Sequence, residues 1–154
     1  ALALALVKER PRWDVVASDI SLEALETARN NAKKLNLNIN LVQANWLESF
    51  SKRKFNLIIS NPPYMNSEDK RLTADGLKFE PKVALVSERG GFAHIENISL
   101  SAPLFLKKGG YLFLEHGPLQ TRQVRSYLHQ AQFIDLSTYK DLNGDNRVTS
   151  GKRS

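Results

Sequence analysis

The chain has 154 residues, of which 42% are hydrophobic, and it carries a net charge of +6 with a pI near 9.7. This length suits one domain with a substantial core, and no apolar run approaches the ~18 residues that a membrane span needs. Because cysteine is absent and no secretory signal is present, disulfides are excluded and we expect a cytoplasmic protein without a membrane partner.

Helical and strand-like patterns alternate along the chain. In chain order the predicted elements are a helix at 1–10, a strand at 13–18, a helix at 21–36, strands at 39–43 and 55–60, a helix at 91–107, a strand at 111–115, a helix at 119–130, and a closing pair of strands at 133–139 and 147–150. This alternation predicts an α/β sandwich with a mainly parallel sheet and an antiparallel C-terminal edge.

Several residues set the predicted boundaries. Ser21 is suited to cap the helix that follows it, and Gly109-Gly110 predicts the end of the helix at 91–107. The first helix has no N-cap residue and no initiator Met, so we expect it to begin outside the chain, which looks like a fragment. Residues 65–90 lack a clear period and are interpreted as a long irregular excursion, of a kind that is usually functional.

The segment Asn61-Pro62-Pro63-Tyr64 directly follows the predicted strand at 55–60. A buried strand with this ending places a carboxamide and a tethered carbonyl at the carboxyl edge of a sheet, where α/β proteins bind ligands. Two adjacent acceptors suit a planar NH2 group, and Tyr64 offers a flat face beside it. The pattern therefore predicts methylation of an amide or exocyclic amine nitrogen, with Asn61, Pro62 and Tyr64 as the catalytic residues. The alternative interpretation is a simple strand-terminating turn.

Two further strand ends carry candidate cofactor-binding residues. Asp19, at the tip of its strand, could accept both hydroxyls of a ribose, or it could be a solvated residue near a helix start. Asn45-Trp46 follows the next strand, where adenine could lie against the indole and meet a polar side chain. A core Trp with an incidental neighbour is the equal alternative.

The remaining motifs are weaker signals. Glu80 is held extended by Pro81 and could reach a substrate, although a solvated acid is the simpler interpretation. His116 follows Glu115 at a strand end, where a lone His is more often structural than catalytic, and its role stays open on the sequence. Asp141-x-Asn143-x-Asp145 has the acidic spacing of a calcium loop, but the glycine and final glutamate positions do not match, so a metal site is rejected.

These residues together resemble the class I S-adenosylmethionine methyltransferases and, within them, the peptide chain release factor glutamine methyltransferases. The segments that carry the resemblance, in the family's order, are Asp19-Ile-Ser21, Asn45-Trp46, Ser60-Asn61-Pro62-Pro63-Tyr64, Phe79-Glu80-Pro81 with Ala84-Leu85, Leu114-Glu115-His116-Gly117, and Asp141-Leu142 with Arg147-Val148. The resemblance implies a Rossmann-like C-terminal methyltransferase catalytic domain over residues 1–154, truncated at its N-terminus. Its first strand and glycine-rich loop would be missing.

The resemblance also implies roles for individual residues. Asp19, Asn45 and Trp46 would bind S-adenosylmethionine, with Asn61 contributing to the cofactor site as well. The substrate would be the glutamine in the Gly-Gly-Gln motif of a release factor, whose amide Asn61 and Pro62 would hold. The residues implied to line the substrate pocket are Asn61, Pro62, Pro63, Tyr64, Glu80 and Pro81.

Two departures from the family pattern matter. Asn45 stands where an acidic residue is usual, which changes the expected adenine contact. Without the glycine-rich loop, this chain alone is expected to bind the cofactor poorly and to be inactive as it stands.

Two other functions stay open on the sequence. An amino-methyltransferase acting on adenine, cytosine or guanine in RNA or DNA shares the Asn-Pro-Pro-Tyr segment, and the positive charge favours it slightly. A non-catalytic truncated remnant is the alternative of another class. We expect a monomer with a release factor as partner.

Overall fold

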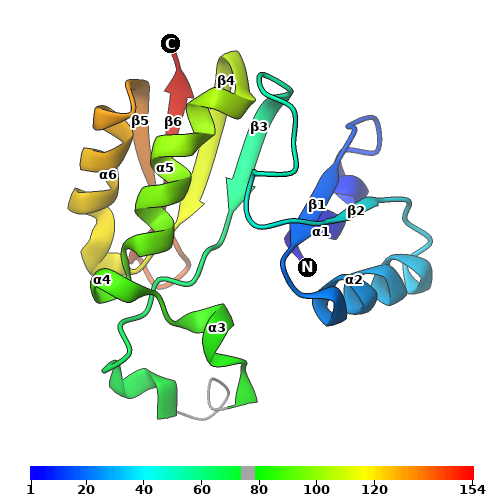
Figure 1. Cartoon of the computed structure of the whole chain (residues 1–154), viewed down its shortest axis with the longest axis horizontal. Helices are drawn as coiled ribbons and strands as arrows, with labels where there is room; N and C mark the ends of the chain where they lie inside the picture. Colours follow the sequence, from blue (N-terminus) through cyan, green and yellow to red (C-terminus); the bar gives the residue numbers. More distant parts are fainter. Residues whose placement is uncertain (74–78) are drawn as a thin grey trace. The chain divides into compact units, whose positions relative to one another are not determined.

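The computed structural model describes residues 1–73 and 79–154, and the chain folds as two compact units, Ala1–Ser49 and Phe50–Ser154 (Figure 1). No helix in the described part of the chain is long and apolar enough to cross a membrane.

The first unit contains a two-stranded parallel sheet. Its elements are α1 (Leu2–Glu9), β1 (Val16–Asp19), α2 (Leu22–Lys34) and β2 (Asn40–Gln43). As predicted, Ser21 caps α2, and its hydroxyl oxygen accepts a hydrogen bond from the Ala24 amide at 3.2 Å. Asn36 takes a left-handed conformation with φ 54° just past the helix, which agrees with the predicted stop. α2 packs against both strands and buries Leu25 and Ala32.

The prediction of a buried strand at 13–18 is wrong in two respects. Trp13 is 49% exposed and lies outside β1, whose first paired residue is Val16. Along β1, Val16 and Ala17 are half-buried while Ser18 and Asp19 are exposed. Each strand of a two-stranded sheet has a single neighbour, so its side chains keep more contact with solvent than those of a central strand.

The second unit is built on a four-stranded mixed sheet in the order β3-β4-β6-β5. Its elements are β3 (Phe55–Ser60), η1 (Lys70–Thr73), α3 (Lys82–Leu85), α4 (Glu88–Gly91), α5 (Ala93–Phe105), β4 (Leu106–Glu115), η3 (Pro118–Gln120), α6 (Thr121–Gln130), β5 (Phe133–Lys140) and β6 (Asn146–Arg153). β3 and β4 are parallel, and β6 runs antiparallel to both β4 and β5. The predicted α/β class with an antiparallel C-terminal pair is confirmed, with β6 inside the sheet and β5 at its edge.

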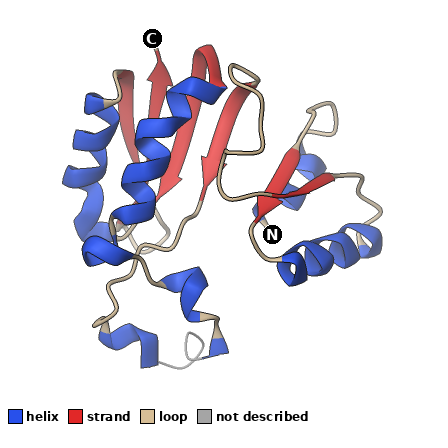
Figure 2. Ribbon diagram, in the orientation of Figure 1, coloured by secondary structure: helices blue, strands red, loops and turns tan. Residues whose placement is uncertain are grey.

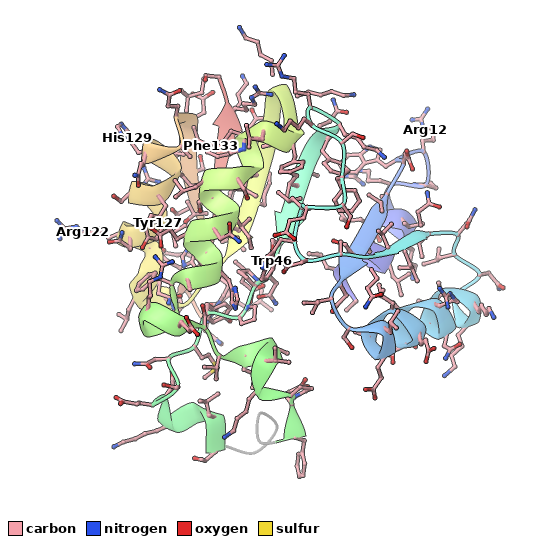
Figure 3. The ribbon with its side chains drawn as sticks, in the orientation of Figure 1. Arg12, Trp46, Arg122, Tyr127, His129 and Phe133 are labelled. Atoms are coloured by element: carbon pink, nitrogen blue, oxygen red, sulfur yellow. The ribbon has the colours of Figure 1, made fainter. Side chains whose placement is uncertain are left out.

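The core of the second unit lies between this sheet and the helices on one of its faces. Figures 1 and 2 show α5 and α6 side by side across that face, and the two helices contact each other. Tyr127 of α6 packs edge-on against Phe92, with ring centroids 6.5 Å apart, and Phe133 begins β5 at 3% exposure (Figure 3). Further enclosed apolar side chains of this core include Ile95, Ile98, Ala102, Leu106, Leu112, Leu114, Val124 and Leu128.

The boundaries of β3 match the prediction, but those around α5 do not. The helix ends at Phe105, because Leu106 is already extended and pairs with Phe55. The predicted stop at Gly109-Gly110 is therefore wrong, and both glycines lie inside β4. A shift in the pairing register with β3 accommodates them, and Gly109 takes a φ of 77°.

The excursion predicted at 65–90 contains short helical segments rather than a wholly irregular chain. These are η1, α3 and α4, while residues 74–78 lie outside the described residues. Met65, at one end of the excursion, forms a parallel bridge with Val86 near the other.

Candidate functional site

The candidate residues of the second unit gather at one edge of its sheet. β3 and β4 are parallel and both end here, at Ser60 and Glu115. β6 runs the other way, so its first residues lie at the same edge, and Val148 pairs with Glu115. The Asn61–Tyr64 segment, the Glu115–Gly117 segment and the β5–β6 turn therefore meet at this carboxyl edge.

The four residues that follow β3, Asn61-Pro62-Pro63-Tyr64, differ in how far their side chains are exposed. The Asn61 side chain is exposed and hydrogen-bonds to no other described residue, whereas Pro62 is fully buried. Pro63 and Tyr64 are half-buried. Because Pro62 is enclosed and both prolines have a fixed φ, the backbone that carries the Asn61 carboxamide is stiff. The segment therefore exposes the Asn61 carboxamide to solvent on a backbone that Pro62 and Pro63 make rigid.

The buried side chain of Gln120 fixes the backbone at the end of this segment. Its Nε2 donates to the Tyr64 carbonyl at 3.0 Å and to the Gly91 carbonyl at 3.4 Å, and its Oε1 accepts from the Gly117 amide at 2.8 Å. Gly91 has a φ of 93°, and a Cβ placed there would lie 2.3 Å from the Tyr64 carbonyl oxygen. Three backbone segments converge on this one amide side chain.

Two charged side chains, Glu115 and Arg147, act on the Tyr64 hydroxyl. It donates to Glu115 Oε1 at 3.2 Å, and the Arg147 guanidinium is close enough to act on it as well. Burial raises the pKa of the Tyr64 phenol above its usual 10.0, the Glu115 carboxylate raises it further, and Arg147 opposes both. Tyr64 is therefore protonated at neutral pH and can act as a hydrogen-bond donor to Glu115.

Arg147 is itself held by the turn that precedes it. Its Nε and Nη2 donate to Asp141 Oδ2 at 3.1 and 2.9 Å. The other carboxylate oxygen of Asp141 accepts hydrogen bonds from the Asn143 and Asp145 amides. Asp141 therefore stabilises a turn at the segment whose acidic residues have the spacing of a calcium loop. Hydrogen bonding from Arg147 is the main reason that the pKa of Asp141 is lowered.

His116, whose role the sequence left open, is enclosed at the end of β4. The side chain is fully buried, and burial lowers its pKa below 6.5, so the ring is neutral at pH 7. Its Nδ1 lies 2.8 Å from the Gly117 carbonyl oxygen and must carry the proton, because a carbonyl can only accept. Nε2 then accepts from the Thr149 hydroxyl at 2.8 Å, which ties the end of β4 to β6.

Glu80 and Pro81 lie on the segment that returns to the site from the excursion. Both residues are exposed, and the Pro81 carbonyl accepts from the Ala84 amide at the start of α3. The segment then joins the site at Met65, whose amide donates to the Leu85 carbonyl and whose carbonyl accepts from the Ser87 amide, both at 2.9 Å.

The first unit has its own polar edge, where β1 and β2 end side by side. Asp19 pairs in register with Gln43 and is exposed. Its Oδ1 accepts from the Ser21 amide at 2.9 Å, and its Oδ2 accepts from no described residue. The Gln43 side chain donates to the Ile20 carbonyl at 3.1 Å, which fixes the loop after β1 against the end of β2.

Asn45 and Trp46 follow β2 at this edge. The Asn45 side chain donates to Glu48 Oε1 at 3.1 Å. Trp46 is half-buried and takes a φ of 52°, which is rare for a bulky residue. Such conformations concentrate where the chain must aim a side chain in a particular direction.

The predicted site residues therefore form two groups, one in each unit. Asp19, Asn45 and Trp46 share the edge of the β1–β2 sheet, and Asn61 to Tyr64 share the edge of the four-stranded sheet with Glu115. Sequence reasoning missed Gln120 and gave no role to Arg147 or Gly91. Only the adjacent glycines at 90 and 91 offered a local signal, since they allow a left-handed turn.

Comparison with known proteins gives the following matches. The model of the family described as "Methyltransferase small domain" matches residues 1–109. A release factor glutamine methyltransferase of Xylella fastidiosa is 41% identical over 153 residues, and one of Vibrio cholerae is 42% identical over 154. Each match covers 99% of this chain and 56% or 54% of the relative, so the chain spans about half the length of these curated relatives.

Solved structures give the same fold at lower identity. A methyltransferase from Pyrococcus furiosus is 16% identical with a TM-score of 0.72, and the match covers 97% of this chain and 68% of the other. A ribosomal protein L11 methylase from Lactobacillus delbrueckii is 20% identical with a TM-score of 0.70, covering 99% and 64%. The fold is that of the class I methyltransferases.

Proposed function

The chain belongs to the methyltransferase small-domain family, and we propose that it is the catalytic part of a release factor glutamine methyltransferase. The reaction is transfer of a methyl group from S-adenosylmethionine to the side-chain amide nitrogen of the glutamine in a release factor's Gly-Gly-Gln motif. Relatives named for this activity, about 40% identical over 99% of the chain, support the proposal. The observation that most supports this proposal is the exposed Asn61 carboxamide, whose backbone is held rigid by the buried Pro62 next to it.

The residues at the edge of the β1–β2 sheet fit the nucleoside part of the cofactor. Asp19 is exposed with one carboxylate oxygen engaged by no described residue, which suits acceptance of a ribose hydroxyl. Trp46 supplies a flat apolar ring held by an unusual backbone conformation. In this proposal Asp19 holds the ribose, Trp46 lies against the adenine, and the Asn45 carboxamide meets the adenine edge. The bound cofactor supplies an electrophilic methyl group.

The second group of residues would hold the target amide. An amide nitrogen is a weak nucleophile because its lone pair is shared with the carbonyl. If the Asn61 Oδ1 and the Pro62 carbonyl oxygen accept its two hydrogens, positive charge developing on the nitrogen is stabilised during transfer. Tyr64 packs against the planar group and orients it. Pro63 stiffens the segment, and Glu80 and Pro81 line the substrate side of the pocket.

A nucleic-acid amino-methyltransferase is the second candidate. The net charge of +6 favours it, since a phosphate backbone attracts a basic protein. Exocyclic amines of adenine, cytosine and guanine offer the same NH2 geometry to Asn61. We place it second because the named relatives act on release factors. A cytoplasmic location and action as a monomer are part of the leading proposal.

The test offers isotope-labelled S-adenosylmethionine and three acceptors to the protein in the longest form that its gene encodes. The acceptors are release factor, ribosomal RNA and DNA. We expect label on the release factor glutamine and a loss on the order of 100-fold or more in the Asn61→Ala variant. Asn38→Ala is the matched control, because Asn38 is exposed and lies between α2 and β2.

Each outcome decides between the candidates. Label on nucleic acid, lost in Asn61→Ala, would move the function to the second candidate. Absence of label on every acceptor, from a protein that circular dichroism shows to be folded, would leave a non-catalytic remnant. Equal losses in the Asn61 and Asn38 variants would remove Asn61 from the proposed role.

A further inference from the structure

Tyr64 is held in two separate ways, one for its backbone and one for its side chain. Its carbonyl is fixed by Gln120, and the next residue, Met65, is bridged to Val86. These contacts leave the rotation of the ring undetermined. The side chain is anchored at its far end, where the hydroxyl donates to Glu115 Oε1 at 3.2 Å. Anchoring the hydroxyl as well as the backbone fixes the direction in which the ring points, and therefore where the ring lies.

The second partner of this hydroxyl comes from a distant part of the sequence. Arg147 is the second residue of β6, and its guanidinium donates two hydrogen bonds to Asp141, at 2.9 and 3.1 Å. Both side chains of this ion pair are about three-quarters buried, at 25% and 22% exposure, so water screens the pair less than it would a surface pair. A planar, forked guanidinium held in this way keeps its orientation.

We propose that Glu115, Arg147 and Asp141 are positioning residues that act through the Tyr64 hydroxyl and hold the ring in the position against which the target amide packs. This inference rests on the proposed function of Asn61 and its neighbours. Glu115 accepts a hydrogen bond from the hydroxyl, the Arg147 charge acts on the same hydroxyl, and Asp141 holds Arg147 by two hydrogen bonds. Reorientation of the ring would disturb the alignment of the amide nitrogen with the incoming methyl group.

The first test reads Tyr64 directly and needs no substrate. The chain has four tyrosines, so labelling the Cζ of tyrosine with 13C gives few signals, and Tyr64→Phe identifies the one from Tyr64. Glu115→Gln should lower the pKa of Tyr64, because the carboxylate raises it, and Arg147→Met should raise it. Arg122→Met is the control, since Arg122 is exposed on α6. Unchanged Tyr64 titration in both site variants would overturn the proposal.

The second test is a double-mutant cycle on methyl transfer. Arg147→Met and Tyr64→Phe alone should each lower kcat/KM about tenfold, as expected for loss of a hydrogen bond to a charged group. In the Tyr64→Phe background, Arg147→Met should cause a further loss of less than about twofold, because the hydroxyl is already absent. Asp141→Asn should follow the same pattern and serves if Arg147→Met does not fold. Independent, multiplicative losses would refute action through Tyr64.

Measurements of stability and of activity distinguish a positioning role of Arg147 from a purely structural one, and from failure of the proposed function. If Arg147→Met or Asp141→Asn only loosens the β5–β6 turn, each should lower the urea midpoint equally in the wild-type and Tyr64→Phe backgrounds. The effects of the two substitutions on kcat/KM would then be independent of the Tyr64 hydroxyl. If wild-type protein methylates none of the acceptors, the proposed function fails, and the 13C titration alone decides whether Glu115 and Arg147 control Tyr64.

Discussion

At the residue scale, Gly91 leaves no room for a side chain beside the Tyr64 backbone. A Cβ at Gly91 would lie 2.3 Å from the Tyr64 carbonyl oxygen and 2.9 Å from Gln120 Nε2. A side-chain carbon cannot lie so close to a backbone oxygen to which it is not bonded, so any side chain at 91 must push the end of the Asn61–Tyr64 segment away. Gly90 also has a positive φ, of 68°, but a Cβ there would meet nothing within 4 Å.

This contrast predicts different effects for two neighbouring substitutions. Gly90→Ala should cost only the left-handed backbone penalty, roughly 1–2 kcal/mol. Gly91→Ala should cost about 2 kcal/mol more through overpacking, and it should also lower methyl transfer by displacing Tyr64. Urea denaturation followed by circular dichroism measures the stability difference. Equal midpoints for the two variants would contradict the close contact.

The sequence singles out those candidate residues that have a local signal beside them. Asn61 and Pro62 are marked by the strand that precedes them, which the structure confirms as β3. Gln120 could not be found, because an isolated Gln at a helix start has no distinctive local pattern. Its function depends on three backbone segments that are far apart in the sequence.

At the element scale, α2 shows how one hydrogen bond defines a helix end. The Ser21 hydroxyl accepts from the Ala24 amide, and Glu23 lies in the first turn, where it complements the helix dipole. Both tryptophans, Trp13 and Trp46, belong to the same unit as this helix, so their fluorescence reports its unfolding.

Ser21→Ala should therefore destabilise the first unit by about 1 kcal/mol. The measurement is urea denaturation followed by tryptophan fluorescence. Ser51→Ala, the same change at an exposed residue outside any helix or strand, should shift the free energy of unfolding by less than ~0.5 kcal/mol. If the two variants unfold alike, the cap contributes nothing to the stability of α2.

Element ends were predictable where a local signal and the tertiary pairing agree. They agree at Ser21 and along β3, which begins and ends at the predicted residues. They conflict at Gly109-Gly110, because glycine usually follows a helix, yet Leu106 has already left α5 to pair with Phe55. The order of the sheet was also beyond local patterns, since a hairpin pattern cannot say that β6 will insert between β4 and β5.

At the scale of the whole molecule, buried His116 links stability to pH. The folded ring has a pKa below 6.5 because burial disfavours its charged form. The unfolded chain takes up a proton near pH 6.5 that the folded protein does not, so stability is lost as pH falls from 6.5 towards the folded pKa. The ring connects the end of β4 to Thr149 of β6, so the effect falls on the four-stranded sheet.

We therefore expect the melting temperature, followed by circular dichroism, to fall between pH 7 and pH 5. His116→Asn, which can still donate to the Gly117 carbonyl, should flatten this dependence while lowering stability at pH 7. His129→Asn changes an exposed histidine and should leave the slope unchanged. A slope that survives His116→Asn would assign the pH dependence to other groups.

The bridge between Met65 and Val86 holds together the two ends of the segment that lies between them. Two backbone hydrogen bonds of 2.9 Å join Leu85 and Ser87 to Met65, directly after the residues proposed to hold the target amide. Twenty residues, Asn66 to Leu85, separate Met65 from Val86 in the sequence, and the two ends of this insert are neighbours. Doubling the length of such an insert costs only about 0.6 kcal/mol in closure entropy. The number of residues between Met65 and Val86 can therefore vary at little cost in free energy, while the paired ends keep Met65 in place beside the proposed site.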